Sequence, residues 1–335
     1  MALMRLRALA LLLTTLLAPA LQARAECAGQ DLIATLPADD RAALDSATSA
    51  VPYPEGNHWL ARRGATEIGV IGTYHLYDAR MAGLTERLAP VIEGAEALFV
   101  EATEAEVARL QSEIARDPSR LFLTTGPTLP EALAEPEWNR LKAEFAARGI
   151  PPFMGAKFQP WYVSVLLAIP ACLTEGGQEP RKGLDHLLMQ RAAGAGVPTH
   201  ALEPWDTALG LFDALPFDKQ IDMLRASLPL ASQAEDSLAT LEEAYFRQEH
   251  RLIWEYSRLV ALTAPEADTD EVAADFALME EALLTARNRA WIDRLLPEAE
   301  GRRVVMAVGA AHLSGPAGVL QLLKDRGFAL ERRPF

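Results

Sequence analysis

The chain has few cysteines and none of the common catalytic signatures. Its 335 residues include only two cysteines, Cys27 and Cys172, which excludes a cysteine-rich metal site. The sequence also lacks the His-Glu-x-x-His helix of zinc peptidases, the Gly-x-Ser-x-Gly elbow of α/β hydrolases, the P-loop and the Gly-x-Gly-x-x-Gly turn of dinucleotide-binding domains. A serine hydrolase triad stays possible, because its members need not be contiguous, but nothing in the sequence points to one.

Positive charge is also scarce. Lys and Arg number 32 against 46 Asp and Glu, so the formal net charge is −14 at pH 7. An acidic chain of this kind repels nucleic acid and anionic membrane surfaces at long range, and we therefore expect no nucleic-acid partner. Half of the residues are hydrophobic, which is enough for a sizeable core.

The N-terminal hydrophobic run is too short to cross a membrane comfortably. Arg5 and Arg7 precede an apolar stretch over residues 8–21, and Ala23-Arg24-Ala25 has the small-x-small form of a cleavage site. A membrane-spanning helix needs roughly 20 apolar residues. We therefore predict a signal peptide over residues 1–25, cleaved near Ala25, and a periplasmic or secreted protein with no stable membrane span. An uncleaved anchor is the alternative.

Both cysteines remain in the chain after this cleavage. In an oxidising exported compartment such a pair most simply forms one disulfide. A Cys27–Cys172 bond would tie the start of the mature chain to the segment after the apolar run VSVLLAIPA. The alternative is a pair of buried free thiols.

The order of the expected elements indicates an α/β fold. Short β-branched runs alternate with segments of helical periodicity in the first 200 residues, and strand signals are missing between 205 and 297. Two long amphipathic helices are predicted there, at 237–262 and 270–296. We expect residues 26–335 to form a single domain, with 205–297 as a mainly helical insertion or cap. The predicted strands are 65–73, 96–103, 197–204, 302–313 and an edge strand at 328–335, and a helix capped by Ser314 follows the fourth.

Four of these strands end in side chains that can bind a metal ion. Two end in Gly-x-x-His, at His75 and His312, and two end in glutamate, at Glu101 and Glu203. A glycine three residues before each histidine would let the backbone turn sharply as it leaves the sheet. Because ligands bind at the carboxyl ends of strands in open α/β sheets, these side chains are predicted to meet over one sheet edge.

Two imidazoles and one or two carboxylates suit a divalent ion with open positions for water. Manganese, cobalt, zinc and iron all stay possible. Glu101 would be a ligand or the general base, and Glu203 a further ligand or an acid behind the ligands. The alternatives are structural histidines, a Glu101–arginine pair and an ordinary strand-terminal acid at Glu203. Arg287 shares a helix face with Trp291 and would anchor a carboxylate or the substrate, with a structural salt bridge as its alternative.

These motifs resemble those of the TraB/GumN family, which is similar to the Tiki metalloproteases. The resemblance runs from about Gly56 to the C-terminus and includes GNHWLARR, GTYH, the strand ending in Glu101, PAC before a GLD helix, LEPWD, ARNRAW and VGAAHLSGPAGVLQLLKDRGF. It implies a mixed β-sheet flanked by helices, in the wider class of erythromycin esterases and haem-binding ChaN-like proteins. It also implies that His75, Glu101 and His312 match the family's metal and catalytic positions, and that Arg287 and Glu203 match recurrent positions.

The sequence thus predicts an exported metal-dependent hydrolase, most simply peptidase-like, acting on a peptide or small-molecule substrate. Two alternatives stay open. One is a non-catalytic periplasmic protein that uses the same cluster to hold haem, a metal or a small ligand. The other is an envelope factor associated with polysaccharide export whose site is vestigial. The catalytic and binding interpretations share the same residues, so the sequence does not separate them.

Overall fold

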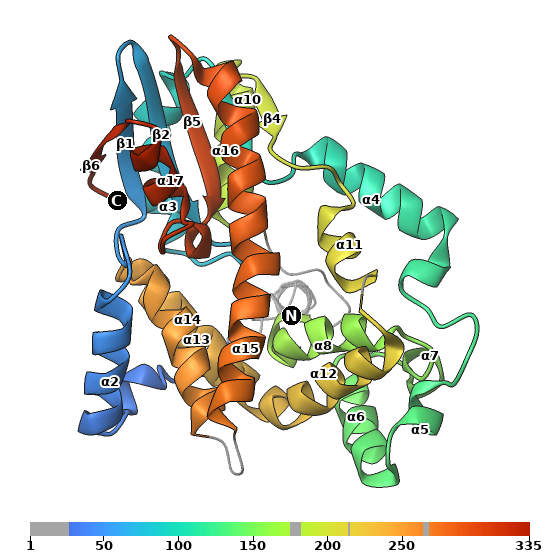
Figure 1. The fold of residues 1–335 in the computed structure, drawn as a ribbon. Coiled ribbons are helices and arrows are strands. Elements are labelled where there is room, and N and C mark those ends of the chain that lie inside the picture. Colours follow the sequence, from blue (N-terminus) through green and yellow to red (C-terminus); the bar gives the residue numbers. More distant parts are fainter. Residues whose placement is uncertain (1–26, 175–181, 214, 264–267) are drawn as a thin grey trace, which may run out of the picture.

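The computed structural model describes residues 27–174, 182–213, 215–263 and 268–335, and these residues contain one six-stranded sheet. The strands are β1 (His58–Arg63), β2 (Thr66–Thr73), β3 (Leu98–Val100), β4 (Thr199–Ala201), β5 (Arg303–Gly309) and β6 (Ala329–Arg332). Their order in the sheet is β4-β3-β5-β2-β1-β6 (Figure 1). The first four of these run parallel, whereas β1 is antiparallel to both β2 and β6. The predicted α/β fold with a mixed sheet is therefore confirmed, and β6 is the expected edge strand.

Helices cover both faces of the sheet. On one face lie α3 (Met81–Glu93) and α10 (Leu184–Ala195), and on the other lie α16 (Ala286–Ala299) and α17 (Val319–Asp325) (Figure 1). Strand β5 alternates between the two cores, since Val305 and Ala307 pack with the first pair of helices and Val304, Met306 and Val308 with the second. A strand buried on both faces reads as a continuous apolar run, as RVVMAVG does.

Most of the other helices lie below the sheet in the view of Figure 1. Four of them, α5, α6, α8 and α12, share a separate core around Leu141, Phe145 and Leu224. Between β4 and β5 the described residues form helices and turns only. The helices and short turns are η1 (Ile33–Thr35), α2 (Ala38–Ser49), α4 (Glu104–Arg116), η2 (Pro118–Arg120), α5 (Leu129–Ala132), α6 (Glu135–Ala147), α7 (Pro152–Gly155), α8 (Pro160–Ala168), α9 (Ala171–Thr174), α11 (Thr207–Asp213), α12 (Phe217–Leu230), η4 (Ala231–Gln233), α13 (Ala234–Phe246), α14 (His250–Leu262), α15 (Thr269–Glu280), η5 (Glu281–Thr285) and η6 (Ala310–His312).

The long helix predicted at 237–262 is two helices. The chain breaks between α13 and α14, where Gln248 adopts a left-handed φ of 64°. The carbonyl of Gln248 accepts a hydrogen bond from the N–H of Gly56 at 2.8 Å, just before β1. The sequence keeps its helical periodicity across Gln248, so the sequence pattern does not predict the break between the two helices. The second predicted helix, 270–296, contains the π-helical turn η5 between α15 and α16.

Two further local expectations are wrong. Strand β1 (His58–Arg63), in the GNHWLARR segment, is missing from the predicted strands, although it pairs with both β2 and β6. Ser314 does not cap the last helix, because α17 begins only at Val319 and its N-cap residue is Gly318. The turn between Ser314 and α17 requires a glycine at 318, because a Cβ there would lie 2.3 Å from the Ser314 carbonyl oxygen.

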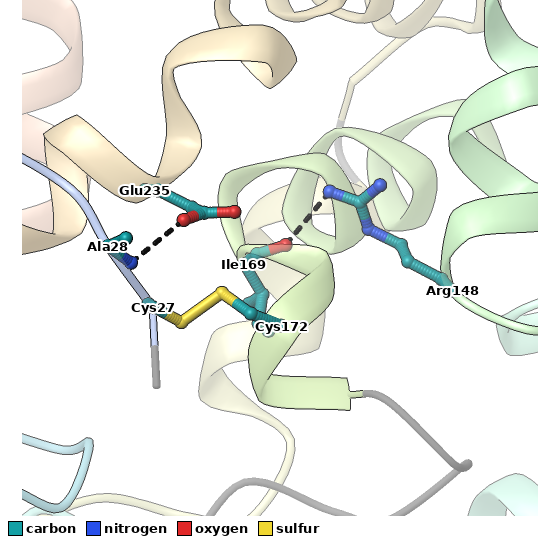
Figure 2. Close-up of a disulfide and its surroundings, with 6 residues drawn as sticks. All are labelled: Cys27, Ala28, Arg148, Ile169, Cys172 and Glu235. Atoms are coloured by element: carbon teal, nitrogen blue, oxygen red, sulfur yellow. Dashed lines mark hydrogen bonds between the residues drawn. A yellow bond between two sulfur atoms is a disulfide. The ribbon is translucent and has the colours of Figure 1, made fainter. Parts of the chain in front are cut away.

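The predicted disulfide is present. Cys27 and Cys172 are bonded across 145 residues of sequence, and the N–H of Ala28 donates to Glu235 of α13 at 3.0 Å (Figure 2). Nearby, the buried Arg148 guanidinium donates to the Ile169 carbonyl at 2.9 Å, just after α8 (Figure 2). The predicted signal peptide, residues 1–25, lies outside the described residues. In the part of the chain that the structure describes, no helix has the length and apolar character needed to span a membrane.

Candidate functional site

The parallel topology brings four chain segments to one edge of the sheet. The four neighbouring strands β4, β3, β5 and β2 run parallel, so their carboxyl ends lie at one edge of the sheet. The segments that follow them carry, in the same order, Glu203, Glu101, His312 and His75. In the pairing of β2 with β5, Thr73 lies opposite Gly309. The two Gly-x-x-His segments therefore start side by side, although more than two hundred residues separate them in the chain.

Three of these side chains converge above Gly309. A Cβ placed on Gly309 would lie 3.2 Å from Oε1 of Glu101, 3.6 Å from Nε2 of His75 and 3.6 Å from Cδ2 of His312. Gly309 has φ −48°, so its role is to leave space rather than to supply a left-handed turn. Gly72 has the same role, because a Cβ there would lie 2.8 Å from Leu313. The two glycines were predicted to let the backbone turn sharply, but in the structure they leave space for neighbouring side chains.

His75 is the positively charged imidazole of the cluster. Its Nδ1 lies 3.5 Å from Oδ2 of Asp185, on the first turn of α10, and its side chain is 60% exposed to the cavities around it. The hydrogen bond with Asp185, aided by the charge of Glu101, outweighs desolvation and raises the pKa of His75 to about 9. With Nδ1 held by Asp185, Nε2 is the ring nitrogen that faces the cluster.

His312 is the uncharged imidazole of the cluster. Its Nδ1 lies 2.6 Å from Oδ1 of Asn288, whose Nδ2 donates to the carbonyls of His312 and Ala317 at 3.3 and 2.9 Å. These carbonyl contacts fix the amide orientation, so Nδ1 of His312 is the donor and Nε2 keeps its lone pair. Burial lowers the pKa of His312 to about 4. The ring packs at 4.4 Å, centroid to centroid, on Trp291.

Arg287 joins the two carboxylates. Its Nη2 donates to Glu101 at 2.8 Å and to Glu203 at 2.7 Å, and its Nε donates to Glu203 at 2.9 Å. Trp291, one turn further along α16, donates its Nε1 to the same Glu203 carboxylate at 2.9 Å. Both oxygens of Glu203 are therefore engaged by α16, and its carboxylate holds Arg287 in place. The π-helical turn η5 immediately precedes Arg287, and Nη1 also donates to the Leu283 carbonyl at 3.2 Å.

Glu101 is anionic throughout the physiological pH range. Burial would raise the pKa of Glu101, but the positive neighbours His312, His75 and Arg287 and the N–H of Gly309 lower it to about 2. At neutral pH the charge comes from His75 and Arg287, because His312 is then uncharged. The Gly309 N–H donates to Oε1 at 2.7 Å, and Oε2 accepts from Arg287.

The donor types suit a divalent ion, but no ready coordination sphere is formed. Among the described residues, no three His, Cys, Asp or Glu side chains are grouped so that they could hold a metal ion. The physical reason is the place of Arg287, whose guanidinium contacts Glu101 and Glu203 and lies 3.4 Å from Nε2 of His312. Open space for a bound group lies above Gly309, at the position that a Cβ would take between His75 Nε2 and Glu101 Oε1.

Several residues around the cluster are not evident from the sequence. Asn288 stands next to Arg287 in the ARNRAW segment, but nothing local shows that it holds His312. The hydroxyl oxygen of Thr73 and Oδ1 of Asp185 are buried, line the site and have no hydrogen-bond partner within the described residues. Such polar atoms are available to a bound ligand. His200, close to Glu203 in sequence, is exposed and stacks on Phe99.

The fold and the cluster define a class of α/β proteins. In this class a mixed sheet carries a His/Glu/Arg site at the carboxyl ends of its four parallel strands. The profile of the TraB/PrgY/gumN family matches residues 57–332, and the chain belongs to this family. It is 25% identical over 276 aligned residues to "Uncharacterized protein YbaP" of Escherichia coli (strain K12). The alignment covers 80% of this chain and 94% of the E. coli protein. The same identity and coverage hold for the protein of that name from Shigella flexneri.

Proposed function

We propose that this protein is an exported metal-dependent hydrolase, peptidase-like in its chemistry. His75, after losing the proton on Nε2, and His312 would bind the ion, with Glu101 as the third ligand. Membership of the family, the shared sheet edge of these residues and their donor types support the proposal. Manganese, cobalt, zinc and iron suit this nitrogen and oxygen donor set.

The way the two imidazoles are held is the observation that carries the proposal. In metal sites, a ligating histidine almost always donates its other ring nitrogen to a carboxylate, a carbonyl or water. Here Nδ1 of His75 faces Asp185 and Nδ1 of His312 faces Asn288, at 3.5 and 2.6 Å. Both rings thus turn Nε2 toward the cluster. Structural histidines buried in a core usually spend both nitrogens on the scaffold, as His250 does with Asn57 and Tyr53.

The charges of the cluster suggest separate roles for its acids. A carboxyl with a pKa of about 2 is a weak base, so Glu101 is better suited to hold a cation than to take a proton from water at neutral pH. Glu203 is committed to Arg287 and Trp291, which favours the role of an acid behind the ligands over that of a ligand. Arg287 would then present its guanidinium to negative charge that develops on the substrate carbonyl oxygen.

A bound divalent ion would lower the pKa of water and polarise the substrate carbonyl. In the hydrolysis of an amide, the water oxygen adds to the carbonyl carbon, the carbon–nitrogen bond breaks and a proton passes to the leaving nitrogen. The residues of this chain would hold the carbonyl against Arg287 and keep the water next to Glu101. Export is supported by the predicted signal peptide and by the disulfide, which persists in oxidising compartments.

The test is hydrolysis of a peptide mixture by the mature protein, with and without chelator, followed by mass spectrometry. Wild-type protein should cleave only when a divalent ion is supplied, and His75→Ala and His312→Ala should each lose cleavage. His200→Ala is the matched control, because His200 is on the same sheet but exposed and away from the cluster. Cleavage that survives in both alanine variants, or that ignores the chelator, would sink the proposal.

One observation favours a second candidate, a non-catalytic ligand-binding protein. An apolar cavity adjoins His312, lined in part by Tyr245 and Trp254, and a haem or small-ligand protein needs such a space. A Soret band in the purified protein that disappears in His312→Ala would support this candidate. A colourless protein with metal-dependent cleavage would exclude the haem version.

A further inference from the structure

Two cavities meet at the cluster. The first has a volume of ≈ 330 Å³ and reaches toward α13 and α14, and the second, also ≈ 330 Å³, reaches toward α4 and α10. Thr73, His75, Glu101 and Arg287 line both cavities. A molecule bound across these shared residues would therefore place one group in each cavity.

The outer wall of the first cavity consists of large carbon-rich side chains. Leu241 and Tyr245 come from α13, and Ile253 and Trp254 come from α14. Trp254 packs edge-to-face against Phe276 of α15, with the ring centroids 5.8 Å apart and the ring planes at 83° to each other. We call this space the apolar cavity.

Two hydroxyl groups in the wall of the apolar cavity donate hydrogen bonds within the protein. The Tyr245 hydroxyl donates to the Gly72 carbonyl at 3.0 Å, and the Ser257 hydroxyl donates to the Ile253 carbonyl at 3.0 Å.

His250 also lines the apolar cavity without offering it a charge. Its two ring nitrogens lie 3.1 Å from Oδ1 of Asn57 and 3.0 Å from the Tyr53 carbonyl. Burial lowers the pKa of His250 to about 4, so the ring is uncharged at neutral pH. Away from the cluster, the described wall therefore presents carbon to whatever enters, and a polar group placed there would lose its hydrogen bonds to water.

The second cavity has a different wall. Lys182 lies 3.0 Å from Glu104, and Nδ1 of His186 lies 2.5 Å from the same carboxylate. Asp185, the partner of His75, completes this ionic side. The second cavity thus carries charged side chains next to apolar ones such as Val107 and Met189, whereas the wall of the apolar cavity that lies away from the cluster carries no charged side chain.

The size of the apolar cavity limits what it can hold. Pockets for small molecules measure roughly 300–1,000 Å³, and this cavity is at the lower end of that range. It suits one large side chain rather than a whole extended ligand, and the cluster forms its inner end.

We propose that the apolar cavity is the subsite for a bulky apolar side chain of the substrate, of phenylalanine or leucine size, directly beside the bond that the cluster cleaves. The proposal rests on the hydrolase function proposed above and narrows its substrates to peptides with such a residue at the cleavage site. The part of the substrate on the other side of the bond lies in the second cavity.

The first test uses quenched peptides that differ only at the two positions around the central bond. The wild-type protein should cleave peptides with Phe or Leu there at least about tenfold faster, in kcat/KM, than peptides with Ala. Leu241→Trp, which fills the cavity, should remove this preference by slowing cleavage of the Phe and Leu peptides. Trp254→Ala, which removes part of the wall, should also reduce it and serves if the first variant fails to fold.

Val260→Trp is the matched control, because Val260 is on α14 but outside the cavity and 39% exposed. It should keep the wild-type preference. Cleavage by the wild type that is indifferent to Phe, Leu or Ala would overturn the subsite while leaving the hydrolase intact.

A second test needs no turnover. N-acetyl-phenylalaninamide should bind the wild type in saturation-transfer NMR, N-acetyl-alaninamide should bind at least about tenfold more weakly, and Leu241→Trp should abolish the difference. If this pattern appears but no peptide is cleaved, the cavity stands as an apolar subsite and the hydrolase proposal fails. Equal binding of the two amides would overturn the cavity's assignment.

Discussion

Replacing Asn288 tests the arrangement of His312 most sharply. Asn288 is 1% exposed and makes three hydrogen bonds, to Nδ1 of His312 and to the carbonyls of His312 and Ala317. Asn288→Leu keeps a similar volume but removes all three. Water cannot easily replace the lost partners at a site this buried, so the histidine N–H loses its acceptor.

Two magnitudes follow from this change. Leaving a buried polar group unpaired costs about 1–3 kcal/mol of unfolding free energy. If His312 binds an ion through Nε2, losing the partner on Nδ1 should also weaken metal affinity by about 10–100-fold. That factor equals about 1.4–2.8 kcal/mol of binding free energy.

A second buried Asn–His pair supplies the control. Asn57 is 0% exposed, lies 3.1 Å from His250 and donates to the Tyr245 carbonyl at 2.9 Å. Asn57→Leu should lose a comparable unfolding free energy in urea. In competition with a chelator for Mn²⁺ or Zn²⁺, only Asn288→Leu should bind more weakly. If Asn288→Leu is destabilised but holds the metal as tightly as Asn57→Leu does, the reasoning about His312 is refuted.

Three other outcomes are expected. Cys172→Ser, which opens a disulfide across 145 residues, should lower the unfolding free energy by about 2–5 kcal/mol, and reductant should then have no further effect on the urea midpoint. Gly309→Ala places a Cβ 3.2 Å from Oε1 of Glu101, so cleavage should fall on the order of tenfold while the urea midpoint stays near that of the wild type. Burial and the charge of Asp78 raise the pKa of Glu242 from 4.5 to about 7, so the folded chain keeps a proton that the unfolded chain releases, and stability should fall as pH rises from 4.5 through 7. Glu242→Gln should remove this pH dependence and raise the unfolding free energy at pH 8 by about 1–2 kcal/mol over the wild type, a magnitude reduced for solvent screening. If the stability of the variant falls with the same slope, another group is responsible.

The sheet and the strand ends could be predicted because their signals are local. The apolar runs before His75 and His312 stop at glycine, and Glu101 and Glu203 follow short apolar runs in the same way. Parallel pairing then places all four at one edge, and the rule for ligand sites in α/β sheets needs nothing more. The disulfide was predicted in a similar way, from the presence of two cysteines and a predicted signal peptide.

The contacts inside the site depend on residues far apart in the chain. Arg287 reaches Glu203 across 84 residues and Glu101 across 186, and no local pattern specifies those pairings. The break at Gln248 depends on its bond to Gly56, and the roles of Gly72 and Gly309 depend on which side chains crowd them. Periodicity describes which face of an element is buried, but it does not describe what that face meets.

The most direct test of the central claim is elemental analysis of the mature protein, purified without chelator, beside His75→Ala, His312→Ala and the control His200→Ala. The account predicts about one divalent ion per chain in the wild type and in the control, and its loss from each of the other two variants. A wild-type protein that holds no divalent ion after supply of manganese, cobalt, zinc and iron, or an ion that remains in both alanine variants, would contradict the claim that the two Gly-x-x-His segments form one metal site.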